Sequence, residues 1–142
     1  MVKRLISAIR PQTRVVGVTW MHSGTGVVLP IRAVSDALAK VNRNRDESDL
    51  VLLVVDGVHG FGVLDEDIAR QGSDFFSAGT HKWIFGPHGT GMVWGRNESW
   101  ALLKPTVPSL MASELNAAWR AGQPPKRACQ GRLDQPRRLL CL

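Results

Sequence analysis

The chain has 142 residues, of which 44% are hydrophobic and 21% charged, and this composition suits one globular domain rather than a disordered chain. Its formal net charge is +6, but residues 1–118 are nearly balanced and residues 119–142 hold 6 Lys and Arg against 1 acidic residue, so we expect no nucleic-acid partner for the folded part. No apolar run reaches the ~20 residues of a membrane helix, and residues 5–9 are too few for a signal-peptide core, so we expect a cytoplasmic protein without membrane contact.

The first regular elements that the pattern predicts are a strand, a helix and a second strand. Residues 13–20 are apolar and β-branched, and they run into the small-residue loop MHSGTG, as a buried strand would. Apolar residues then recur at spacings of 3, 4 and 3, which places them on one face of a helix. These residues are Ile31, Val34, Leu38 and Val41. Residues 50–55 are all apolar, and their short run and valines favour a strand buried on both faces of a parallel sheet over a buried helix.

A strand, a helix and a strand in this order indicate a βαβ unit of an α/β domain. A short polar turn or helix at 64–72 leads to another candidate strand at 73–81. Residues 89–95 read as one more strand, and they follow so closely that an antiparallel pairing is expected. The predicted fold class is therefore α/β with a mostly parallel sheet.

Polar residues follow two of the predicted strands. Asp56 comes directly after the run 50–55, His59 lies three residues later, and Lys82 lies at the end of the next strand. Such sheets bind ligands at the carboxyl ends of their strands, so these side chains converge if the two strands are neighbours. An enzyme that uses pyridoxal phosphate needs this set. Its lysine forms a Schiff base with the cofactor aldehyde, and a carboxylate keeps the pyridine nitrogen protonated.

Each of these residues also has an ordinary structural explanation. A carboxylate such as that of Asp56 can cap a turn, a histidine such as His59 can be a hydrogen-bonded structural residue, and an isolated lysine is usually solvated. The four histidines include no pair at HExxH spacing and have no cysteine nearby, so we expect no metal site. The five tryptophans are scattered, which favours a packing role over base stacking.

Three strings occur in order between residues 5 and 125, namely VTWMHSGTGVVLPIR, VDGVHGFG and AGTHKWIFGPHGTGMVWG. Together they resemble the class V aminotransferase family, on its isopenicillin N epimerase and cysteine desulfurase side. Members of that family have the fold-type I pyridoxal-phosphate architecture. The resemblance implies that residues 1–118 are a fragment of the large domain, a partial three-layer sandwich. It also implies pyridoxal 5′-phosphate as the cofactor, an amino acid as the substrate and a homodimer as the intact enzyme.

The resemblance assigns roles to the residues at the strand ends. Lys82 matches the catalytic Schiff-base lysine, Asp56 the aspartate that pairs with the pyridine nitrogen, and His59 the residue that touches the ring hydroxyl. The reaction would be transamination, epimerisation or C–S cleavage. All three share a first carbanion, so these residues do not separate them.

Three further residues match the cofactor site by the same resemblance. His81 and Thr80 match residues near the cofactor phosphate, and Ser23 matches a polar residue that contacts the ring. Family members are about three times longer than this chain, and their phosphate-binding glycine loop and substrate-binding domain would lie beyond its two ends. The alternative is therefore a truncated, noncatalytic remnant or a binding module, and a partial sheet of this kind would leave apolar strand faces open.

Residues 119–142 form a basic tail with three prolines and no apolar periodicity. We expect this tail to be disordered, or to result from a reading frame lost near Pro125. Cys129 and Cys141 lie in it at a spacing that matches no common metal motif, so we interpret them as incidental thiols. Binding of nucleic acid or acidic lipid surfaces by the tail is a weaker alternative.

Overall fold

The computed structural model of the chain describes residues 1–103, 113–123 and 139–141. The predicted tail falls mostly outside the described residues, and so do its predicted disorder and the predicted break near Pro125. Residues 139–141 are described, and they form a short strand that the sequence does not predict.

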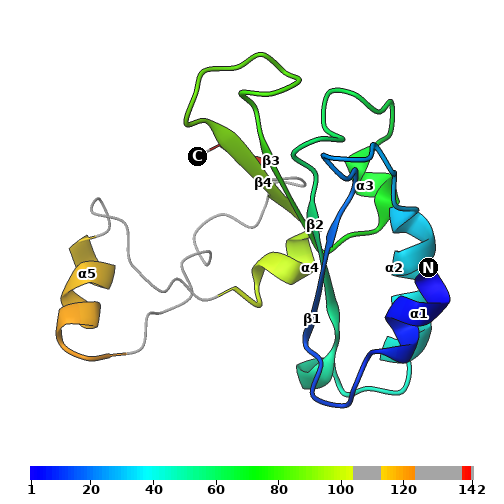
Figure 1. Cartoon of the computed structure of the whole chain (residues 1–142). Helices are drawn as coiled ribbons and strands as arrows, with labels where there is room; N and C mark the ends of the chain where they lie inside the picture. The colour runs from blue at the N-terminus through cyan, green and yellow to red at the C-terminus, as the bar shows by residue number, and fades with distance from the viewer. Residues whose placement is uncertain (104–112, 124–138, 142) are drawn as a thin grey trace. The chain divides into compact units, whose positions relative to one another are not determined.

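The chain divides into two compact units, whose helices and strands are labelled in Figure 1. The first contains Met1–Arg96 and the strand β5 (Leu139–Cys141), and the second contains the helices α4 (Asn97–Trp100) and α5 (Ser113–Arg120). The domain boundary that we expected at residue 118 stays a prediction. All candidate site residues belong to the first unit.

The first unit is built on a five-stranded sheet in the order β1-β2-β3-β4-β5. Its other strands are β1 (Val15–Thr19), β2 (Leu52–Asp56), β3 (Phe75–Gly79) and β4 (Gly91–Gly95). The first three strands run parallel, whereas β4 pairs antiparallel with β3 and β5 pairs antiparallel with β4. The α/β fold class is confirmed, and so is the antiparallel pairing of the strand that follows Lys82.

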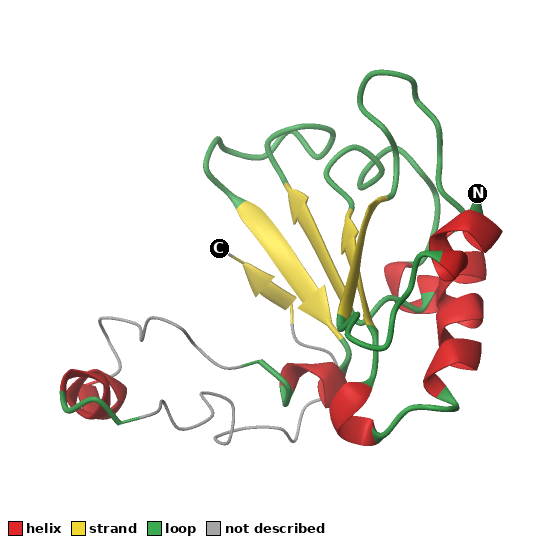
Figure 2. Cartoon of the chain, turned by 60° about the horizontal axis from the view of Figure 1, so that its bottom comes forward, coloured by secondary structure: helices red, strands yellow, loops and turns green. Residues whose placement is uncertain are grey.

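The helices of the first unit are α1 (Val2–Ser7), α2 (Ile31–Asn42), the single 3₁₀ turn η1 (Glu47–Asp49) and α3 (Ile68–Gln71). Figures 1 and 2 show α1 and α2 on the same side of the sheet. Ser35 of α2 donates a hydrogen bond of 2.8 Å to the Gly72 carbonyl, which ties α2 to the end of α3. No helix in the described part of the chain is long and apolar enough to cross a membrane.

The hydrophobic core lies between α2 and the sheet. Three of the four predicted helix positions are buried, namely Ile31, Val34 and Leu38. Val41, one residue before the end of the helix, is only partly buried and lines an open pocket instead. The buried ring of Phe76 anchors the core from β3, where it meets Trp20 edge to face at 5.9 Å.

Strand β2 departs from the burial that its continuous apolar run predicts. Leu53 and Val55 are fully buried, whereas Leu52 and Val54 on the opposite face are only partly buried. The prediction of burial on both faces is therefore wrong for this strand. The physical reason is that alternate residues point to opposite faces, and α1 and α2 both cover the face of Leu53 and Val55.

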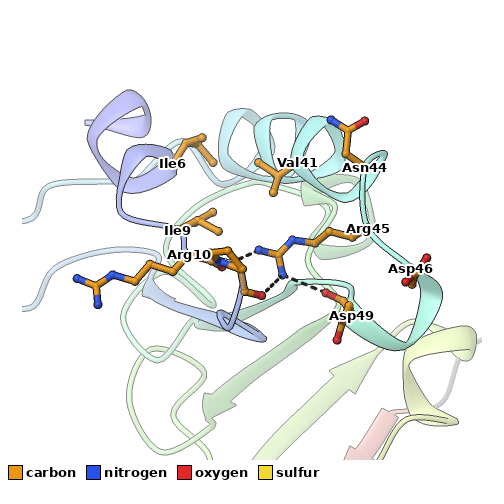
Figure 3. Close-up of a pocket in the computed structure, with 9 residues that line it drawn as sticks. Ile6, Ile9, Arg10, Val41, Asn44, Arg45, Asp46 and Asp49 are labelled. Carbon is orange, nitrogen blue, oxygen red and sulfur yellow. Dashed lines mark hydrogen bonds between the residues drawn. The ribbon is translucent and has the colours of Figure 1, made fainter.

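One arginine holds the segment before β1 against the end of α2. The Arg45 guanidinium donates hydrogen bonds to the carbonyls of Arg10 at 2.7 Å, Pro11 at 3.1 Å and Thr13 at 2.9 Å, and to that of Asp49 at 3.1 Å. Figure 3 shows Arg45 between these segments, in the pocket that Ile6, Ile9 and Val41 also line. The planar guanidinium can bond several acceptors at once, which a lysine amine cannot do with the same geometry.

Replacing Arg45 by Met should lower the free energy of unfolding by about 2 kcal/mol, because the four carbonyls that accept from the charged guanidinium all lose their donor at once. Urea denaturation followed by tryptophan fluorescence measures the change. Arg43→Met is the matched control, since Arg43 is exposed at the same helix end, and it should change the value by less than about 0.5 kcal/mol. Equal effects of the two substitutions would contradict the role given to Arg45.

Candidate functional site

The sheet brings two strand ends to one edge. Strands β2 and β3 are parallel neighbours with Asp56 opposite Ser77, so the carboxyl end of β2 lies beside that of β3. The Asp56 side chain is exposed, and one of its carboxylate oxygens accepts a hydrogen bond of 3.0 Å from the Val58 N–H. This bond is the turn-capping contact expected of an aspartate after a strand. It leaves the second carboxylate oxygen free of any bond within the described residues.

The turn after β2 is held tightly against the core. A Cβ atom at Gly57 would overlap the ring of Phe76, and one at Gly60 would overlap the indole of Trp20. Neither position has room for a side chain, so glycine is required at both for the turn to lie this close. His59 is carried by this turn and is therefore fixed relative to the core.

Lys82 and His59 meet across the strand ends. The Lys82 Nζ lies 3.0 Å from the His59 Nε2, and both side chains are partly buried. The lysine nitrogen and the imidazole nitrogen are within hydrogen-bond distance, and the imidazole tautomer decides which of the two donates. The predicted convergence of these two residues is present in the structure.

His81 and Asp56 line one open pocket of about 510 Å³ beside the ends of β3 and β4. The His81 Nδ1 is buried and has no hydrogen-bond partner within the described residues. Its ring stacks on that of His88 at a centroid distance of 5.5 Å. Gly79 makes this position possible, since a Cβ there would lie 2.8 Å from the His81 ring.

The other two predicted residues are placed differently. The Thr80 hydroxyl is bonded to that of Thr90, at the far end of the loop that carries Lys82. Ser23 is exposed in the loop between β1 and α2, and it shares no hydrogen bond with the other candidates within the described residues. The structure thus places five of the six candidates at or just after two neighbouring strand ends, with Lys82 against His59 and with Asp56 and His81 on one pocket, and it leaves Ser23 in a separate loop.

Two residues of the loop after Lys82 contribute to this region and were not predicted from the sequence. They are His88, which stacks on His81, and Thr90, which lines the same pocket. Both lie in the glycine-rich stretch GPHGTG, in which we predicted no site residue. A histidine and a threonine between glycines carry no periodic signal, because their contacts depend on how the loop closes.

The described groups fit pyridoxal phosphate in kind. Lys82 supplies a primary amine, Asp56 has an unbonded carboxylate oxygen for a ring nitrogen, and the buried His81 Nδ1 lacks a partner that a phosphate oxygen could provide. The pocket is lined in part by three glycines, which lets a ligand approach the backbone closely.

The fold is shared with the solved structure of an enzyme that holds this cofactor. A cystine C–S lyase variant with glycine covalently linked to its pyridoxal phosphate cofactor matches with a TM-score of 0.66 at 27% sequence identity. The match covers 74% of this chain and 26% of the lyase. The first unit therefore has the architecture of part of a pyridoxal-phosphate enzyme's large domain.

The aminotransferase class-V family profile matches residues 1–122, and the chain belongs to this family. Isopenicillin N epimerase of Streptomyces clavuligerus is 34% identical over 88 residues, which are 62% of this chain and 20% of the epimerase. A probable cysteine desulfurase of Aeropyrum pernix is 33% identical over 99 residues, 70% of this chain and 22% of that protein. The chain thus spans between a fifth and a quarter of the length of these relatives.

Gly57→Ala should lower the free energy of unfolding by about 3 kcal/mol, the upper range for an overpacked core, because the new methyl group overlaps the Phe76 ring. Thermal and urea unfolding of the full chain measure this loss. Gly17→Ala is the matched control within the same sheet, since a Cβ there meets nothing within 4 Å. A change at position 17 as large as that at position 57 would refute the steric explanation.

Proposed function

We propose that this chain forms the lysine-bearing part of a pyridoxal-phosphate enzyme that acts on an amino acid, with Lys82 as the covalent attachment point. The single observation that carries the proposal is the position of the Lys82 Nζ, which lies 3.0 Å from the His59 Nε2. This contact lies at the edge of the sheet where β2 ends at Asp56. A solvated surface lysine has no reason to be fixed against a histidine in this way. Membership of the class V family supports the same role.

Each residue contributes through its own chemistry. When bound, the cofactor supplies an electron sink for a carbanion at the substrate α-carbon. The Asp56 carboxylate would hold a proton on the ring nitrogen, and His59 would bind the ring hydroxyl. Once its amine is released, Lys82 would take and return the substrate α-proton at Nζ. His81 would bind the phosphate through its unpartnered Nδ1.

The substrate class is an amino acid, and the reaction type is transamination, epimerisation or C–S cleavage. A solved cystine C–S lyase of similar fold contains its product cysteine persulfide, and other relatives are named as an epimerase and desulfurases. These names support amino-acid chemistry without separating the three reactions. The intact enzyme would act as a homodimer in the cytoplasm, with Ser23 reaching the ring from the loop after β1.

The covalent role of Lys82 is tested by mixing the full chain with pyridoxal 5′-phosphate and reducing with borohydride. Peptide mass spectrometry should find the adduct mainly on Lys82 in the unaltered chain. Lys82→Ala should lose this adduct, whereas Lys40→Ala, at an exposed lysine of α2, should retain it. An unaltered chain labelled equally on all exposed lysines would contradict the proposal and favour the noncatalytic binding module.

Asp56→Asn should weaken pyridoxal 5′-phosphate binding by about tenfold, because a hydrogen bond to a charged group contributes about 1.5–3 kcal/mol. The substitution keeps the size of the side chain and an oxygen to accept the Val58 N–H. Equilibrium titration by cofactor absorbance gives the dissociation constant. Asp46→Asn, at an exposed aspartate before η1, is the matched control and should leave it unchanged. Unaltered affinity in Asp56→Asn would remove Asp56 from the site.

A further inference from the structure

The loop that carries Lys82 is closed by a threonine pair. Thr80 follows the end of β3 and Thr90 precedes β4, and their hydroxyl oxygens are hydrogen-bonded to each other. The Thr80 N–H also donates to the Thr90 carbonyl at 3.1 Å. The two residues therefore clasp the base of the loop through both backbone and side chains.

The hydroxyl protons of this pair can be assigned. The Thr90 hydroxyl lies 2.6 Å from the Pro87 carbonyl oxygen, which can only accept, so Thr90 donates its proton there. A threonine hydroxyl has one proton, so in the Thr80–Thr90 bond Thr80 is the donor. The single proton of Thr80 is thus used inside the loop. A phosphate group offers acceptor oxygens, and Thr80 has no proton left for one.

The rest of the loop depends on the same closure. The Gly86 N–H donates to the Thr80 carbonyl at 2.8 Å, and the Phe85 N–H donates to the Lys82 carbonyl at 3.2 Å. Phe85 has a φ of 56°, a left-handed conformation that is unfavourable for a bulky side chain. Such a conformation persists where surrounding bonds enforce it. The clasp supplies those bonds on both sides of Lys82.

We propose that Thr90 is a positioning residue that acts through Thr80 to hold the Lys82 loop, and that Thr80 is not a donor to the cofactor phosphate. The proposal rests on the proposed function for its effect on cofactor binding, and on the hydrogen bonds of the loop for the clasp itself. It changes the role that the family resemblance implies for Thr80. His81, with its buried and unpartnered Nδ1, remains the phosphate contact.

The test compares pyridoxal 5′-phosphate with pyridoxal, which lacks the phosphate. Borohydride-trapped adduct on Lys82 is quantified by peptide mass spectrometry as a function of aldehyde concentration. A positioning role predicts that Thr90→Val and Thr80→Val weaken adduct formation with both aldehydes by the same factor, about tenfold for one lost hydrogen bond and its unpaired acceptor. Thr90→Ser, which keeps the hydroxyl, should restore adduct formation to near the unaltered level.

Two results would overturn the proposal. If Thr80→Val weakens binding of the phosphorylated aldehyde and leaves that of pyridoxal unchanged, Thr80 is a phosphate ligand. If Thr90→Val and Thr90→Ser behave alike, the hydroxyl has no positioning role. Thr25→Val is the matched control. It removes a threonine hydroxyl that bonds to His22 in another loop, and it should leave adduct formation with both aldehydes unchanged.

Amide hydrogen exchange tests the clasp without any cofactor. Thr90→Val should speed exchange at the Thr80 and Gly86 amides by about tenfold, while the Trp20 amide, bonded to Asp56 on the neighbouring strand pair, keeps its rate. Faster exchange at all three amides would indicate general destabilisation. Thr80→Ser keeps the hydroxyl bond to Thr90, so in that case its exchange rates would decide whether the bond itself protects the loop amides. If the unaltered chain forms no adduct on Lys82, the proposed function fails, and these exchange rates still decide whether the clasp exists.

Discussion

The candidate site depends on the parallel pairing of β2 with β3. With Asp56 in register with Ser77, both strands end at the same edge of the sheet, and the turn after one faces the loop after the other. A one-residue slip would turn Asp56 to the opposite face, because strand side chains alternate. The buried side chains Val55 and Phe76 oppose such a slip, since it would move them out of the core. Core packing and site geometry are therefore set by one register.

The sequence predicts the strands and the main helix well, because each has a strong local signal. The 3-4-3 spacing that includes Ile31 and Leu38 predicts a helical face, and the short, valine-containing run 50–55 favours a strand over a buried helix. Burial is predicted less well. A continuous apolar run cannot show whether one or two layers cover it, and Leu52 and Val54 are only partly covered.

The sequence predicts which residues lie at the strand ends better than it predicts the contacts that they make. Asp56, His59 and Lys82 follow strand ends, so their convergence needs only the assumption that the strands are neighbours. The pairing of Thr80 with Thr90 is different, because it joins residues at the two ends of a loop whose path has no periodicity. Only the structure of the closed loop shows that the Thr80 hydroxyl donates its hydrogen bond within the protein.

Hydrogen-bond capacity separates the residues that build this site from those free to bind a ligand. Thr80 and Thr90 have used their hydroxyl protons, and the glycine turn under His59 is fixed by the rings of Phe76 and Trp20. By contrast, one oxygen of the Asp56 carboxylate and the Nδ1 of His81 have no hydrogen-bond partner within the described residues.

Lys82 belongs to neither group, because its amine has one hydrogen-bond partner in the described part of the chain, His59, and this bond is reversible. Its amine and the His59 Nε2 share one hydrogen bond, in which the donor depends on the imidazole tautomer, and this bond is given up when the amine forms a covalent bond elsewhere. A closed loop with one reversible side-chain contact near its start holds the amine in place and leaves it available. This combination is what a lysine needs if it is to bind an aldehyde, release it to a substrate and then move a proton from the same position.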